Sequence, residues 1–212
     1  MQIIIHRGIT LDIHPDYSQF VRLHDENLAA FRRHIALHGL GQAMVLHATG
    51  HVVTGLRMPT LKDRSICRVE HTPSQQSEQG AITPLDRICL LLSGYIAECL
   101  FEGTEYGSTT SIDEWHEAQG LCNEFALENG IPHQHVFAAC VTAVESFLGK
   151  QESAIEFAAQ YLAEAEGQAF LSPGLGHLLN GIPRLNLSEI VMATLKEDGL
   201  DDEYERIERL MP

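Results

Sequence analysis

The feature that most constrains the fold is a strongly apolar segment at residues 84–101. Thr83 and Pro84 suit the N-cap and the first position of a helix, and Gly103 closes it. Between them, apolar side chains fall on nearly every face of that helix. Because a helix that is apolar all round must be covered on all sides, we expect it to be the central core helix of the domain.

The rest of the chain predicts a mainly α fold with a small β element. Apolar and polar residues alternate over 65–71, which indicates a half-buried strand, and residues 2–5 favour a second, short strand. Gly39 and Gly41 are interpreted as a break between the first two helices. Besides the central helix, we expect helical segments at about residues 16–37, 44–55, 112–129, 133–148, 151–166, 188–198 and 201–210.

Length and charge limit the class of protein. The 212 residues fit one domain, which we divide into an N-terminal strand and helix (1–38), a core region (40–165) and a C-terminal helical extension (166–212). A formal net charge of −15 argues against nucleic acid or an anionic membrane as the partner. Five cysteines without a C-x-x-C pair favour reduced thiols. We therefore expect a cytoplasmic protein that binds a protein, a peptide or a second copy of itself.

Two pairs of histidines are spaced four residues apart, which puts both members on one face of a helix. His47 and His51 lie in an apolar run and have the spacing of the zinc-binding H-E-x-x-H motif. Ala48 stands where that motif has its general base. The other pair, His34 and His38, follows two arginines that would repel a metal ion, so we interpret it as structural.

A zinc site with two histidines needs a third ligand, usually a carboxylate. Glu114, with Asp113 as the alternative, begins a separate helix and is the best candidate. Ser111 and Glu114 also have the spacing of a capping box, in which the glutamate bonds the backbone instead. Glu98, on the central helix, is either a group that supports the metal ligands or a buried and paired carboxylate, and we favour the second interpretation.

Three blocks of the chain, in order, resemble the peptidase domain of the FtsH-type ATP-dependent zinc metalloproteases. Residues 45–51, V-L-H-A-T-G-H, are similar to that family's H-E-A-G-H helix. Residues 85–103 are similar to its L-D-R-I…A-E-E helix. Residues 108–114, S-T-T-S-I-D-E, are similar to its S-T-G-A-x-N-D segment, whose last aspartate is the third zinc ligand. The resemblance implies an FtsH-type, peptidase-like helical domain.

The resemblance also implies zinc as the cofactor, with His47, His51 and Glu114 as its ligands. No catalytic residue is assigned, because Ala48 cannot take a proton from zinc-bound water. We therefore expect a pseudo-peptidase that acts in binding or assembly. Two alternatives remain: a weakly active metal-dependent hydrolase that uses another base, such as Asp113, and a metal-free structural module.

Overall fold

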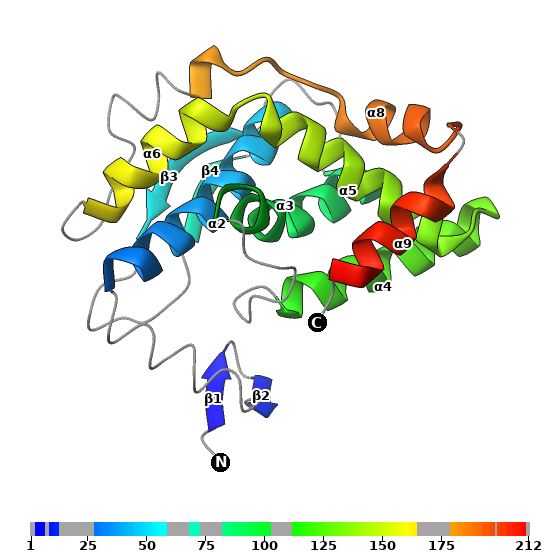
Figure 1. Ribbon diagram of the computed structural model, residues 1–212, viewed down its shortest axis with the longest axis horizontal. Coiled ribbons are helices and arrows are strands. Elements are labelled where there is room, and N and C mark those ends of the chain that lie inside the picture. Colours follow the sequence, from blue (N-terminus) through cyan, green and yellow to red (C-terminus); the bar gives the residue numbers. More distant parts are fainter. Residues whose placement is uncertain are drawn as a thin grey trace.

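The computed structural model is mainly helical and carries two small antiparallel sheets (Figure 1). This confirms the predicted fold class at the level of a helical domain with a minor β element. The structure describes residues 3–6, 9–12, 28–58, 68–72, 82–102, 112–164, 179–197 and 199–210. Its helices include α2 (Leu28–Ala48), α3 (Pro84–Glu102), α4 (Ile112–Asn129), α5 (His133–Gly149), α6 (Glu152–Glu164), α8 (Leu187–Thr194) and α9 (Leu200–Leu210).

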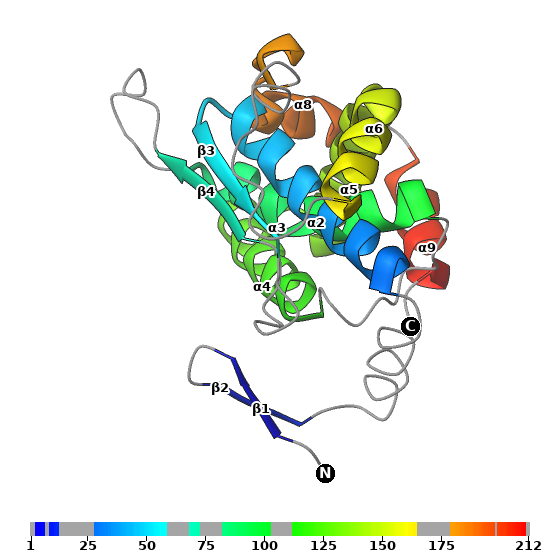
Figure 2. The same cartoon turned by 90° about the vertical axis from the view of Figure 1, so that its left-hand side faces the viewer.

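Helix α3 occupies the interior of the helical body, as its apolar sequence predicts. It packs against α2, α4, α5 and α8, and it lies between α2 and α4 in Figure 2. Ile88, Leu92 and Ile96 are fully buried. Trp115 fixes the start of α4 on this core, because its ring lies 4.8 Å from the rings of both Tyr95 and Phe137.

Helices α2 and α3 approach each other closely at two glycines. A Cβ atom at Gly41 would lie 2.3 Å from the carbonyl oxygen of Ser93, and one at Gly94 would lie 2.5 Å from the ring of His38. The prediction of a helix break at Gly39 and Gly41 is therefore wrong: α2 runs through both glycines without interruption. At Gly41 the absent side chain serves helix packing and does not end the helix.

The end of α2 leads into a β-hairpin that lies along that helix (Figure 2). Gly50 has a φ of 99°, a backbone conformation that glycine adopts easily, and it turns the chain into β3 (Val52–Arg57). Strand β3 pairs antiparallel with β4 (Arg68–Thr72). The prediction that the second helix extends to about Gly55 is wrong, because a helix cannot continue through this turn.

Most other predicted elements agree with the structure where it describes them, but the helix predicted at 188–198 is shorter, because α8 ends at Thr194. Strand β4 confirms the predicted strand over 68–71, and residues 65–67 lie outside the described residues. Strand β1 (Ile3–His6), which pairs with β2 (Ile9–Asp12), confirms the N-terminal strand. The first part of the predicted helix at 16–37 is not among the described residues. None of the described helices is long and apolar enough to cross a membrane.

Candidate functional site

A buried cluster of polar side chains joins α2, α3 and α4. We call it the His–Glu cluster; it consists of His34, His38, Gln42, Glu98 and Glu114. The first three lie at successive turns on one face of α2, because they are spaced four residues apart. Glu98 comes from the central helix α3, and Glu114 lies in the first turn of α4.

Glu98 is the centre of the cluster. Its Oε1 lies 2.8 Å from Nδ1 of His38, and its Oε2 lies 3.2 Å from Nε2 of His34. Glu98 is fully buried, and the exposed fractions of His38 and His34 are only 2% and 5%. The prediction that Glu98 is a buried, paired carboxylate is therefore confirmed.

Glu114 closes the cluster from the other side of His38. Its Oε2 lies 3.1 Å from Nε2 of His38, and its Oε1 accepts a hydrogen bond of 2.9 Å from Nε2 of Gln42. Each ring nitrogen of His38 therefore faces a different carboxylate. Ser111, the partner of Glu114 in the alternative capping box, lies outside the described residues.

The two carboxylates decide the charge of His38. Burial alone would lower the pKa of His38, but its interactions with Glu114 and Glu98 outweigh burial and raise the pKa to about 10. Burial alone would raise the pKa of Glu98, but hydrogen bonding to His34 and His38 lowers it to about 2. These shifts favour the charged forms of both groups, so we interpret the cluster as ionic at neutral pH, with His38 as an imidazolium.

The histidines of the predicted zinc site lie in a different place. His47 is in the last turn of α2, whereas His51 follows the end of that helix, so the two do not share a helical face. The carbonyl oxygens of both accept hydrogen bonds from the guanidinium of Arg184, at 2.9 and 3.2 Å. The ring of His51 packs edge-on against that of His71. Burial, together with the nearby positive charge of Arg184, lowers the pKa of His47.

The structure does not bring Glu114 to His47 and His51. Glu114 contacts His38, which lies nine residues before His47 on the same helix. Nine residues of α-helix span about 13 Å along the axis, too far for shared ligation. Asp113, the alternative ligand, is exposed on α4. The histidine pair that faces Glu114 is the one that we interpreted as structural.

The interpretation of His34 and His38 as structural agrees with their place in a buried ion-pair cluster. Of the two arginines before this pair, Arg33 forms an ion pair with Glu156 of α6 at 3.6 Å. Its charge is therefore partly compensated on another face of α2. The sequence signal that we did not use is the spacing of His34, His38 and Gln42, which puts three polar side chains on one face of α2.

The His–Glu cluster has the donor types that zinc prefers, imidazole nitrogen and carboxylate oxygen. As placed, these donors do not fit a zinc ion. Glu98 lies between the two imidazoles, and the nitrogens of His38 point to opposite carboxylates instead of one central point. Within the ranges that the structure describes, no three His, Cys, Asp or Glu side chains are arranged to hold a metal ion.

Comparison of the chain with models of protein families, with curated proteins and with solved structures finds no match in any of the three.

Proposed function

We propose that the chain is a metallopeptidase-like domain without hydrolytic activity, a pseudo-peptidase, which acts by binding a protein or peptide. One observation carries this proposal: α2 presents His34 and His38, four residues apart, to the carboxylates of Glu98 and Glu114. Ile35 follows the first histidine and is buried, with 4% of its surface exposed. In the H-E-x-x-H motif, this position holds the glutamate that activates water.

This proposal retains the resemblance to the FtsH-type peptidase domain. It assigns the histidine pair of that family's motif to His34 and His38 instead of His47 and His51. If Glu114 corresponds to the third ligand of that family, the pair beside it is His34 and His38. Neither histidine pair of this chain has a general base at the second position of the motif. Ile35 stands there in one pair and Ala48 in the other, and neither side chain can accept a proton.

Burial of the cluster also argues against catalysis. A catalytic zinc site keeps one position open for water and substrate. The exposed fractions of His38 and Glu98 are 2% and 0%, so these groups present almost no surface to a peptide bond. A missing general base alone typically lowers a rate by about 10²–10⁴-fold. The two defects together support a domain that does not hydrolyse peptides.

One observation favours a second candidate function, a residual metal-binding domain. Oε2 of Glu114 is buried and lies 3.1 Å from Nε2 of His38, with which it forms an ion pair. Two atoms that each bind a tetrahedral zinc ion at 2.0–2.1 Å lie about 3.3 Å apart. A modest rearrangement of these two side chains would let them share a divalent ion.

Proteolysis of an unfolded protein tests the main proposal. The chain is purified without a histidine tag, loaded with zinc or treated with EDTA, and incubated with fluorescein-labelled casein. We expect no cleavage that differs between the zinc-loaded and EDTA-treated samples. Cleavage that EDTA abolishes, and that is lost in His38→Ala, would refute the pseudo-peptidase.

Elemental analysis separates the two candidates and also tests the site predicted from the sequence. The wild type is compared with His38→Gln and with the matched control His47→Gln. Negligible zinc in all three proteins is the result that we expect. Zinc that is lost only in His38→Gln would support the metal-binding candidate. Zinc that is lost only in His47→Gln would support the site at His47 and His51.

A further inference from the structure

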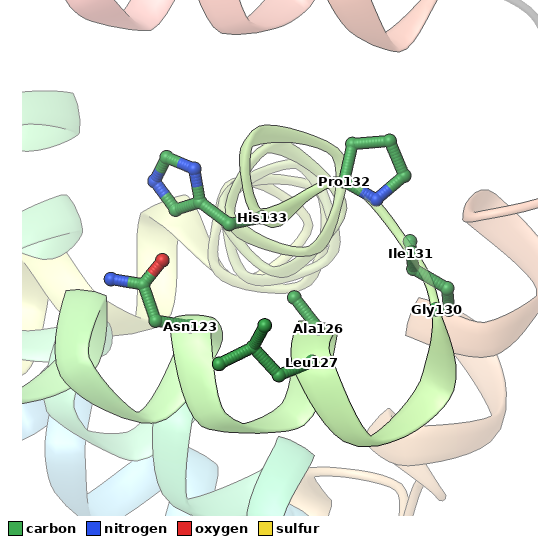
Figure 3. Close-up of a pocket in the computed structure, with 7 residues that line it drawn as sticks. All are labelled: Asn123, Ala126, Leu127, Gly130, Ile131, Pro132 and His133. Carbon is green, nitrogen blue, oxygen red and sulfur yellow. The ribbon is translucent and has the colours of Figure 1, made fainter.

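A shallow hollow lies where the chain turns from α4 into α5 (Figure 3). Its volume is about 490 Å³. The lining is mostly apolar: Ala126 and Leu127 extend from α4, and Ile131, Pro132 and His133 come from the turn and the start of α5. We call this hollow the α4–α5 pocket.

Leu127 gives the pocket an unusual exposed apolar edge. Its exposed fraction is 85%, higher than that of any other large apolar side chain that the structure describes. Single exposed leucines are common on protein surfaces and carry no meaning alone. This one lies at a concave apolar surface, which is the form that a docking site for an apolar side chain takes.

Backbone hydrogen bonds hold the pocket in shape. Gly130 has a φ of 65°, and the N–H of Ile131 donates to the carbonyl of Ala126 at 3.0 Å, the pattern of a Schellman motif at the end of α4. The N–H groups of His135 and Val136 donate to the carbonyl of Pro132 at the start of α5. A preformed pocket loses little conformational freedom when it binds a partner.

The surroundings of the pocket are acidic. Glu124 and Glu128 are exposed on either side of Leu127 along α4, and this helix contains no lysine or arginine. Asp201 of α9 is hydrogen-bonded to His135, just beyond the pocket. With a net charge of −15 on the whole chain, a second copy of the protein would be repelled from this surface, whereas a basic segment would be attracted.

We propose that the α4–α5 pocket docks a segment of a partner protein in which an apolar side chain is flanked by lysine or arginine. The apolar side chain packs on Leu127 and Ile131, and the basic residues lie near Glu124 and Glu128. The proposal rests on the binding role proposed above and names its surface and the chemistry of its partner. It does not depend on the state of the His–Glu cluster.

Selection from a phage-displayed library of random peptides tests this proposal. The wild-type chain is the bait, and an unrelated acidic protein is the control. We expect the enriched peptides to carry an apolar residue between basic residues. No enrichment over the control protein, or enrichment of peptides without basic residues, would overturn the proposal.

Binding of one selected peptide, measured by fluorescence polarisation, then locates the surface. Leu127→Ser should weaken binding about tenfold or more. Phe157→Ser, which changes a side chain on α6 that is 76% exposed, is the matched control and should leave binding unchanged. The double change Glu124→Gln and Glu128→Gln should weaken binding and reduce its salt dependence. Equal binding by wild type and Leu127→Ser contradicts the assignment.

Two further outcomes are distinguishable. If sedimentation analysis shows a dimer and Leu127→Ser abolishes it, the pocket binds a second copy of the chain and the proposal of a basic partner segment is overturned. Proteolysis that EDTA abolishes would refute the pseudo-peptidase but would not change the peptide-binding result. Conversely, failure of the phage selection would not change the prediction that the chain does not hydrolyse proteins.

Discussion

Replacement of Glu98 by glutamine tests the His–Glu cluster most directly, because it removes a charge and keeps the shape of a fully buried side chain. Glu98 lies 2.8 Å from His38 and 3.2 Å from His34. Removal of one partner of a buried ion pair costs about 3–5 kcal/mol, because an uncompensated charge remains. Since Glu114 still faces His38, we expect Glu98→Gln to lower the free energy of unfolding by about 3 kcal/mol, at the lower end of this range.

The dependence of stability on pH gives a second readout. The pKa of His38 is raised from 6.5 to about 10, so its contribution to stability is complete below pH 6.5 and is lost as the pH rises toward 10. The pKa of Glu98 is lowered from 4.5 to about 2, so its contribution is complete above pH 4.5 and is lost as the pH falls toward 2. These two groups therefore favour maximal stability between pH 4.5 and 6.5. In Glu98→Gln, the alkaline loss should be smaller.

Urea unfolding followed by circular dichroism at about pH 6 and about pH 9 measures both effects. Glu117→Gln is the matched control, because Glu117 is paired with Arg87 at the surface and such a pair contributes only about 0–1 kcal/mol. A loss below about 1 kcal/mol in Glu98→Gln would refute the ionic cluster. Equal stability of the wild type at both pH values would show that His38 does not carry the charge assigned to it.

Three further predictions concern packing, capping and thiol chemistry. Gly94→Ala places a methyl group 2.5 Å from the ring of His38 and should lower the free energy of unfolding by about 1–3 kcal/mol, whereas Gly120→Ala, with open space around it, should not destabilise the protein in the same urea titration. Arg184→Ala removes the donor to the carbonyl of His47, in the last turn of α2, and to that of His51, just beyond it. It should cost about 1 kcal/mol by thermal unfolding, with partial rescue in Arg184→Lys. Hydrogen bonding to neighbouring thiols and burial raise the pKa of Cys140, so this thiol should react with Ellman's reagent only after urea unfolds the chain; reaction in the native state would contradict its burial.

Local signals made the helices from residue 84 onward predictable. The hydroxyl of Thr83 accepts a hydrogen bond of 3.1 Å from the N–H of Asp86, as expected for the N-cap of α3. Gly130 ends α4 with a positive φ, as the Asn129-Gly130 sequence predicts. These interactions join residues a few positions apart, so the order of residues alone contains the necessary information.

The errors around α2 come from signals that have two physical meanings. A glycine weakens a helix, but it also lets two helices approach, and only the partner decides which effect wins. At Gly41 the partner is Ser93 on α3, more than fifty residues away along the chain. Strand β3 was missed for a similar reason, because it becomes recognisable only through its pairing with β4.

The candidate site was also hard to predict, because its contacts join residues that are far apart in the sequence. The sequence predicted that Glu98 is paired, because a buried carboxylate requires a partner, but it did not identify His38, sixty residues away. The spacing of His47 and His51 implied a shared helical face, which the end of α2 at Ala48 removes. The spacing within one helix was therefore noticed at the wrong pair: the histidines that face carboxylates, His34 and His38, lie 13 residues before His47 and His51.

The close packing of α2 on α3 supports a function at the surface. The ring of His38 lies directly on Gly94, so a substrate could reach this histidine only if the two helices separated. Separation would expose the core side chains between them, such as Leu37, Leu40 and Leu92, which are fully buried. Because each such side chain stabilises the fold by about 1.5–3 kcal/mol, opening would cost a large part of the total stability. Access to the His–Glu cluster would therefore require the core to open, so the partner that we propose would bind on surfaces that are exposed in the folded protein.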